Sequence, residues 1–277
     1  MTKHLLLNNN FISLTDNDEE LYREYGCDTK ILDVRYPILL AYWEPLYRLK
    51  DGIMLIAVKE NDGYIFLPPM GNMSKGLEQI TQISPNPSIG YMNKEQANAC
   101  PFRTQADLRF SDYLVLRDDL ITLSWKYKHK LSDYNYFIKH YDIRIDTMNK
   151  SNAKDCITVL DNWCSGRDCS LCLFGCEKPV LKKYISSTSK SLHGIIAYCD
   201  NKPIGNLIAC KEGDTLYYPY CKADNSYNGL SVYMYVEMAR RFNVQYVNLG
   251  SDGGINGIKS FKNKFKPYTL IDKYFTV

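Results

Sequence analysis

The chain has 277 residues, 45% of them hydrophobic and 23% charged, so it is long enough for a full core and for two compact units. No run approaches the roughly 18 to 20 consecutive apolar residues of a membrane span, and the start "MTKHLLLNNNFISLTDNDEE" turns polar too early for a secretory signal. We therefore expect a cytoplasmic protein without an integral membrane segment, whose net charge of +3 permits contact with nucleic acid or anionic lipid without requiring it.

The first part of the chain alternates apolar runs with turns. We predict a helix over 38–49, a strand over 52–60, a hairpin turn at 61–63, a strand over 64–71 and a helix over 76–83. Residues 112–123 fit a strand and a helix equally well. Apolar residues recur at helical spacing from 127 to 141, which predicts a helix joining two halves of the chain.

The second half repeats the pattern with clearer boundaries. Periodicity and turn residues predict helices over 153–164 and 178–189, three strands within 192–224, a helix over 230–242, a strand over 244–249, a turn at 250–254 followed by a helix, and a final strand over 268–277.

This order of elements resembles that of the GNAT acyltransferase fold. The resemblance implies a mixed α/β fold of two GNAT-like modules in tandem, each a mixed, largely antiparallel sheet flanked by helices. We place a degenerate module at 1–124, a connecting helix at 125–145 and a second module at 146–277.

The stretch "NLGSDGGINGIKSFKNKFKP" at 248–267 contains a glycine-rich bend before a lysine-bearing helix. It is not a nucleotide-binding P-loop, because Ile258 separates Gly257 from Lys259 where that motif needs glycine directly before lysine. A strand, a bend and a helix nevertheless point unpaired backbone N–H groups at whatever lies beyond the strand end.

Three stretches resemble the C-terminal domain of bacterial phosphatidylglycerol lysyltransferases and their stand-alone relatives: "YIFLPPMG", "DYLVLRDDLITLSWKYKHK" and the stretch at 248–267. The chain departs from the closing motif of that family at two positions. Gly250 replaces an acidic residue, and Lys259 replaces an arginine, which keeps the charge but loses planar bidentate binding. The matching positions are Asn248, Asp252, Gly254, Gly257, Ile258, Lys262, Phe265 and Pro267.

The resemblance implies an enzyme that takes an activated carboxylate, typically from aminoacyl-tRNA, and passes it to an amine or hydroxyl acceptor. The lysyltransferases also carry a membrane-embedded half, and stand-alone relatives act on soluble acceptors, so we expect a lipid or small-molecule acceptor. Direct attack on the donor needs no cofactor.

We predict Asp252, Lys259 and Glu177 as catalytic residues. Their structural alternatives are a turn aspartate, a solvated lysine face and a helix cap. Donor-binding residues are expected around the bend and at "KADNSYNG", where GNAT folds hold the pyrophosphate of coenzyme A. These are Lys222, Gly229, Gly254, Gly257 and Lys262.

Four cysteines form a C-x4-C-x2-C-x3-C run, which offers enough thiolates for a structural zinc ion or, less favoured, an iron–sulfur cluster. Against a metal stand the missing second CxxC pair, the absence of a nearby histidine and the frequent use of cysteine as a small core residue. The predicted ligands are Cys164, Cys169, Cys172 and Cys176.

Two other functions fit the sequence. One is an N-acyltransferase on the same fold that uses an acyl-coenzyme A donor. The other is a non-catalytic binding module with a metal site at the cysteines.

Overall fold

The computed structural model describes residues 1–26, 29–60, 63–124, 127–165, 167 and 176–277, which form two compact units. Unit 1 consists of Met1–Ser111 with Ile271–Val277, and unit 2 of Asp112–Leu270. These limits differ from the expected divisions at 124 and 146, because strand β6 (Asp112–Leu116) pairs antiparallel with β11 (Tyr246–Asn248) of unit 2.

Unit 1 is built on an antiparallel sheet in the order β1-β2-β3-β4. Its third strand, β3, is buried on both faces: Ile53 and Leu55 pack in one apolar cluster, and Met54 and Ile56 in another, as the period-2 alternation of a strand requires. The strands are β1 (Ile12–Ser13), β2 (Leu46–Lys50), β3 (Ile53–Glu60) and β4 (Gly63–Phe66), with a separate pair of β5 (Thr104–Ala106) and β13 (Tyr274–Thr276). The helical segments are α1 (Lys3–Asn8), η1 (Asp16–Asp18), α2 (Glu19–Tyr25), α3 (Tyr36–Tyr42), α4 (Met73–Ile83), α5 (Lys94–Ala99) and η2 (Leu108–Phe110).

The helix predicted over 38–49 is wrong in its second half. Helix α3 ends at Tyr42, and Leu46–Lys50 forms β2. Pro45 explains the difference, because proline has no amide to donate and disfavours helical backbone at the residue before it. Beyond Pro45 the chain finds backbone partners on β3 instead.

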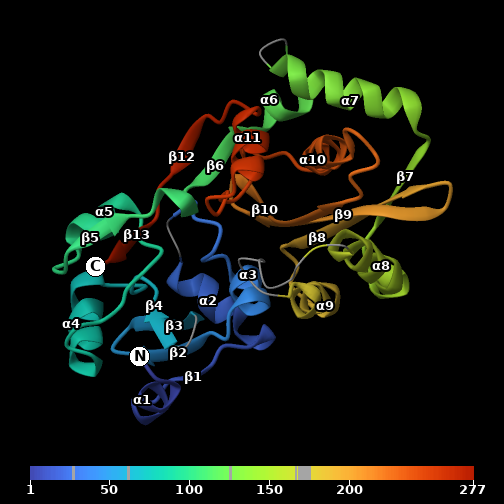
Figure 1. The fold of residues 1–277 in the computed structure, drawn as a ribbon. Coiled ribbons are helices and arrows are strands. Elements are labelled where there is room, and N and C mark those ends of the chain that lie inside the picture. The colour runs from blue at the N-terminus through green and yellow to red at the C-terminus, as the bar shows by residue number, and fades with distance from the viewer. Residues whose placement is uncertain (27–28, 61–62, 125–126, 166, 168–175) are drawn as a thin grey trace. The chain divides into compact units, whose positions relative to one another are not determined.

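Unit 2 carries a seven-stranded sheet in the order β12-β6-β11-β10-β9-β8-β7. Helix α8 packs on β9 and β10 from one face with α9 beside it, and α10 covers the other face (Figure 1). The further strands are β7 (Ile143–Thr147), β8 (Leu192–Cys199), β9 (Lys202–Glu212), β10 (Thr215–Ala223) and β12 (Thr269–Ile271). The helical segments are α6 (Arg117–Thr122), α7 (Lys128–His140), η4 (Lys150–Asn152), α8 (Ala153–Cys164), α9 (Lys178–Ser186), α10 (Leu230–Arg240) and α11 (Asn256–Asn263).

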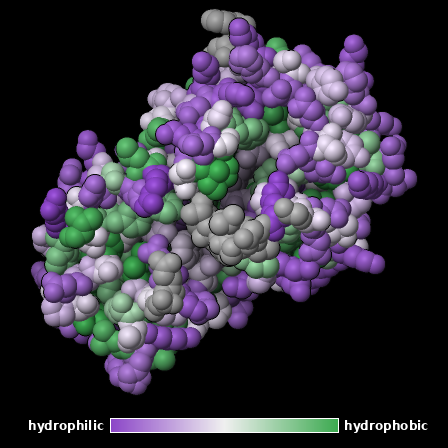
Figure 2. All heavy atoms as spheres, viewed as in Figure 1, coloured by the Kyte–Doolittle hydropathy of each residue, from purple (hydrophilic) through white to green (hydrophobic). Residues whose placement is uncertain are grey.

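Local sequence explains most of these boundaries in unit 2. Asp200 and Asn201 both adopt positive φ, as a two-residue type I′ hairpin between β8 and β9 requires. Residues 112–123, which fitted two interpretations, form a strand followed by a short helix. Helix α7 leaves Lys128, His129 and Lys139 exposed, and Figure 2 shows a largely hydrophilic surface over it.

Candidate functional site

Strands β10 and β11 are parallel, and they stay paired over a short length only. Their register runs from Thr215–Tyr246 to Tyr217–Asn248, after which β10 shifts register and continues to Ala223 beside β9. Two loops therefore follow the carboxyl ends of neighbouring parallel strands, 224–229 and 249–254. The carboxyl ends of parallel strands are where α/β proteins place their ligands.

The bend after β11 is held by a polar network. Asn248 is fully buried; its Nδ2 donates to Asp112 Oδ2 at 3.1 Å and its Oδ1 accepts from Gly250 N at 2.7 Å. The backbone of Tyr113 makes two hydrogen bonds to the bend: its N–H donates to the Gly250 carbonyl, and its carbonyl accepts from the Leu249 N–H. The conformation of the bend is thus fixed by its neighbours on β6.

The structure places Asp252 inside this network. One carboxylate oxygen accepts from the Tyr113 hydroxyl at 2.5 Å and the other from Gly254 N at 2.7 Å, and only 5% of the residue is exposed. Burial, reinforced by the hydrogen bond to the Asp252 carboxylate, raises the pKa of Tyr113 to about 12. Tyr113 therefore stays protonated and keeps donating. In this geometry Asp252 shapes the bend and has little surface open to a substrate.

Lys262 of α11 points back at the same bend. Its Nζ donates to the carbonyl oxygens of Leu249 and Ser251, both at 2.6 Å, and the side chain is buried. Lys259 lies one turn earlier on the same helix and is exposed, as are Gly254 and Gly257. Of these predicted contacts, Lys259 and the two glycines face solvent, whereas Lys262 binds backbone carbonyls.

Glu177 and Lys222 come together although 45 positions separate them in the sequence. The Lys222 Nζ lies 2.5 Å from Glu177 Oε2, and the side chains are 11% and 16% exposed. The same Nζ lies 4.1 Å from the ring centroid of Trp163 at the end of α8, within cation–π range. Glu177, which was predicted to be catalytic, and Lys222, which was predicted to bind the donor, therefore lie in one cluster with Trp163.

The loop after β10 is occupied by its own side chains. Asp224 Oδ1 accepts from the backbone N of Ser226 at 3.0 Å and from its Oγ at 2.7 Å. Gly229 has φ +94°, and a Cβ built on it would lie 2.2 Å from the carbonyl oxygen of Asp133 in α7. Gly229 is therefore explained by the close approach of α7 to the start of α10.

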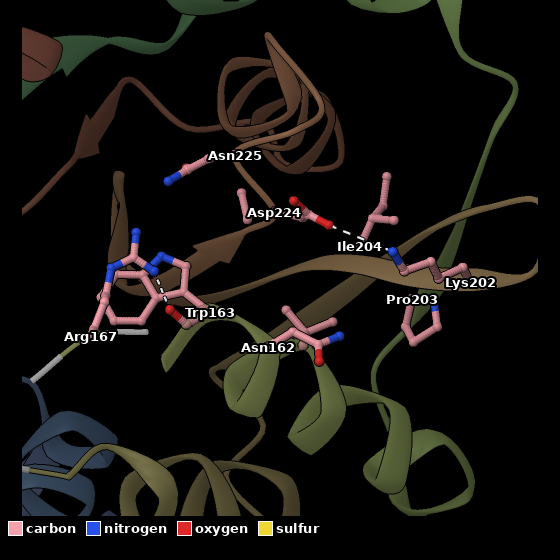
Figure 3. A pocket seen from close by; sticks show the side chains of 10 residues that line it. Asn162, Trp163, Arg167, Lys202, Pro203, Ile204, Asp224 and Asn225 are labelled. Atoms are coloured by element: carbon pink, nitrogen blue, oxygen red, sulfur yellow. Dashed lines mark hydrogen bonds and ion pairs between the residues drawn. The ribbon is translucent and has the colours of Figure 1, made fainter. Parts of the chain in front are cut away.

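A cavity of about 440 Å³ opens beside this loop (Figure 3). It lies between the end of α8, the start of β9 and the end of β10. The Arg167 guanidinium carbon lies 4.0 Å from the Trp163 ring centroid, and Lys202 Nζ lies 3.9 Å from Asp224 Oδ2. The lining residues are Val159, Asn162, Trp163, Arg167, Lys202, Pro203, Ile204, Ala223, Asp224 and Asn225.

Two of the four predicted metal ligands lie within the described residues. Cys164 is half-buried at the end of α8 and Cys176 is exposed. Cys169 and Cys172 lie outside the described residues. Within the described ranges no three His, Cys, Asp or Glu side chains come close enough to hold a metal ion, so zinc remains a prediction.

Sequence reasoning missed Tyr113, Trp163 and Arg167 as members of these networks. Tyr113 and Asp252 are 139 positions apart, and nothing in one sequence pairs them. The signal for Trp163 was available but weak: an aromatic residue ends the helix directly before the cysteine run.

No helix among the described residues is long and apolar enough to cross a membrane. No curated protein sequence matches the chain significantly. Among solved structures, a conserved protein of unknown function from Bacteroides thetaiotaomicron VPI-5482 has a TM-score of 0.88 at 21% identity, over 96% of this chain and 98% of that one.

Two further structures carry functional names. L-PGS from Bacillus licheniformis gives a TM-score of 0.68 at 13% identity, over 95% of this chain and 91% of that one. FemX gives 0.63 at 9% identity, over 96% of both chains. At such identities the likeness establishes the fold, and it confirms the predicted tandem GNAT-like architecture.

The family model described as "Phosphatidylglycerol lysyltransferase, C-terminal" matches residues 92–277. This match spans all of unit 2 and confirms the resemblance that the closing motif indicated. The chain belongs to the phosphatidylglycerol lysyltransferase C-terminal family, with the GNAT-like acyltransferase fold of that family.

Proposed function

We propose that this protein transfers an aminoacyl group from aminoacyl-tRNA to an amine or hydroxyl acceptor. Family membership and the acyltransferase fold support the general reaction. The choice of donor depends on one observation, the occupied loop after β10.

In GNAT folds that use coenzyme A, this loop has to offer free backbone N–H groups to a pyrophosphate. Here the Ser226 backbone N–H already donates to the Asp224 carboxylate, and α7 approaches Gly229 closely. The occupied loop supports our choice of aminoacyl-tRNA over coenzyme A as the donor.

The reaction we propose needs no covalent enzyme intermediate. The acceptor nitrogen or oxygen attacks the ester carbonyl carbon of the aminoacyl group, the bond to the ribose oxygen breaks, and that oxygen leaves with a proton. Positioning of the two substrates and hydrogen bonds to the developing oxyanion lower the barrier. No cofactor enters these steps.

We assign roles to the predicted residues on this basis. Glu177, held in place by its ion pair with Lys222, is the group proposed to accept the proton of the acceptor. Lys259, exposed on α11, is proposed to contact a tRNA phosphate. Asp252 and Lys262 keep the bend in shape as positioning residues.

A transfer assay tests the proposal. The protein is incubated with tRNA charged with labelled amino acids, or with labelled acetyl-coenzyme A, and with phosphatidylglycerol vesicles or small amines as acceptors. We expect label to leave the tRNA and appear on an acceptor, and Glu177→Gln to slow this about 10²- to 10⁴-fold.

Glu78→Gln is the matched control, because Glu78 is exposed on α4 and makes no ion pair in the described structure. Melting curves of both variants show whether they fold. Transfer from acetyl-coenzyme A without transfer from tRNA would replace the proposal by the coenzyme A alternative. Transfer from neither donor would favour a binding protein.

A further inference from the structure

The cavity beside the β10–α10 loop has a chemical character that the proposed reaction does not explain. Figure 3 shows Arg167 beside the Trp163 indole at one side of the opening, with Asp224 and Asn225 across from them. Its volume of about 440 Å³ lies within the usual range for small-molecule sites. A ligand of nucleotide size fits such a space.

Arg167 stacks on Trp163 in the lining of the cavity. The guanidinium carbon of Arg167 lies 4.0 Å from the indole centroid, and an Arg167 N–H donates to the backbone carbonyl of Trp163. The guanidinium therefore lies over one face of the indole, and both groups line the cavity. Aromatic rings and arginine planes are the surfaces on which proteins stack unpaired bases.

The described lining of the cavity carries more positive than negative charge. Among the lining residues that the structure describes, Arg167 and Lys202 contribute two positive charges and Asp224 one negative charge, which leaves a net +1 for this part of the lining. Lys222 lies behind Trp163, where Glu177 neutralises it. A small net positive charge favours a nucleotide with a single phosphate group over 3′-phospho-ADP, the nucleotide part of coenzyme A, which brings more negative charge.

The cavity also offers hydrogen-bonding groups from two side-chain amides. Asn162 and Asn225 line the cavity with carboxamides, and neither side chain has a hydrogen bond to the rest of the described structure. A carboxamide presents a donor and an acceptor together, the arrangement that reads the edge of an adenine. The cavity thus combines a stacking plane, one net positive charge and two amide groups.

We propose that this cavity binds one adenine nucleotide bearing a single phosphate, stacked on the Arg167–Trp163 pair. Its identification as the 3′-terminal nucleotide of the donor tRNA rests on the proposed function. Nucleotide binding itself does not, because it is argued from the cavity alone.

Trp163 provides a direct readout, since the chain has three tryptophans. In the variant Trp43→Phe/Trp125→Phe the fluorescence comes from Trp163 only. This protein is titrated with AMP, a cytidine-cytidine-adenosine trinucleotide, 3′-phospho-ADP and inorganic phosphate, and circular dichroism checks that it is folded.

We expect AMP and the trinucleotide to change the emission with saturation, and 3′-phospho-ADP to bind at least tenfold more weakly than AMP. Arg167→Met in the same background should weaken AMP binding at least tenfold. The matched control is Arg144→Met, because Arg144 also lies over a ring, 4.4 Å from the Tyr198 centroid, but does not line the cavity. It should leave AMP binding unchanged.

Three outcomes would overturn the inference: no saturable response to AMP, equal weakening by the two arginine variants, or tighter binding of 3′-phospho-ADP than of AMP. The transfer assay keeps the two proposals apart. If aminoacyl transfer occurs but AMP does not bind, this inference is wrong and the proposed function stands. If AMP binds but no aminoacyl transfer occurs, the proposed function is wrong and nucleotide binding stands.

Discussion

Gly229 and Gly257 were both predicted to contact a donor, and their surroundings are opposite. A Cβ at Gly229 would lie 2.2 Å from the Asp133 carbonyl oxygen, at a φ of +94°. A Cβ at Gly257, within α11, meets nothing within 4 Å. The first glycine is required by packing, and the second is free to change.

We therefore expect Gly229→Ala to lower the free energy of unfolding by about 2 to 4 kcal/mol, because backbone strain and a clash add together. Gly257→Ala should raise it by up to about 1 kcal/mol, because alanine is the better helix former. Urea unfolding of both variants measures this. Equal effects of the two substitutions would contradict the packing explanation.

The two lysines of α11 that were predicted as functional also differ in their surroundings. Lys262 donates to two carbonyls of the bend, and Lys259 is exposed. Lys262→Met should cost about 2 to 3 kcal/mol of unfolding free energy, because two acceptors of a charged hydrogen bond lose their donor. Lys259→Met should cost less than about 0.5 kcal/mol.

For tRNA binding we expect Lys259 to be the sensitive position. Lys259→Met should lower the magnitude of the slope of log K against log salt concentration by about one unit, which corresponds to the loss of one phosphate contact. A filter-binding series over salt concentration measures the slope. An unchanged slope in Lys259→Met, with normal stability, would remove this lysine from the tRNA contact.

At the scale of elements, α7 and α11 are joined by a buried cation. Lys130 Nζ lies 3.6 Å from the Phe261 ring centroid and 4.7 Å from that of Phe265, and the side chain is 2% exposed. Burial lowers the Lys130 pKa to about 8. Asp133 opposes that shift and Lys264 adds to it, while the two rings favour the charged form.

The sign of the pH effect follows from this lowered pKa. Between pH 8 and the ordinary value of 10.5, the unfolded chain holds a proton on Lys130 that the folded chain has released. Raising the pH through this window therefore stabilises the folded state, by roughly 1 to 3 kcal/mol.

The change is measured as the difference between wild type and Lys130→Met, so that titrations shared by both proteins cancel. We expect the unfolding free energy of wild type minus that of the variant to increase as the pH rises from 8 to 10. Parallel profiles over this range would show that Lys130 does not carry the effect.

At the scale of the molecule, the end of the chain belongs to the unit that contains its beginning. Strand β13 pairs with β5, Lys273 forms a buried ion pair with Asp33, and Phe275 packs against Tyr91 with centroids 5.2 Å apart. Deletion of 271–277 should therefore destabilise unit 1, while unit 2 keeps its sheet.

Hydrogen exchange resolves the two units in this experiment. Amides of β3 should lose protection in the truncated chain, and those of β9 should keep it. Equal loss in both strands would mean that the two units unfold together.

The accuracy of the sequence predictions depended on how local their causes are. Helix α8 was predicted at its observed bounds, because Cys156, Val159 and Leu160 form an apolar stripe that periodicity detects. Strand β2 was missed, because its pairing with β3 is tertiary and its residues also fit a helical pattern.

The site was predicted less completely for the same reason. Glu177 and Lys222 were predicted from their positions along the chain, but their ion pair and its contact with Trp163 arise only when α8, α9 and β10 are packed together. The Tyr113–Asp252 hydrogen bond likewise joins strands that are distant in the sequence. Sequence alone carried no signal for either pairing.

A mass balance on the aminoacyl group tests the proposed transfer reaction most directly. Charged tRNA with a labelled amino acid is mixed with the protein and an acceptor, and both the ester remaining on tRNA and the new amide or ester are quantified over time. We expect one product bond to form for each tRNA ester lost beyond spontaneous hydrolysis. Ester loss that stays at the spontaneous rate, with every acceptor class supplied, would contradict it.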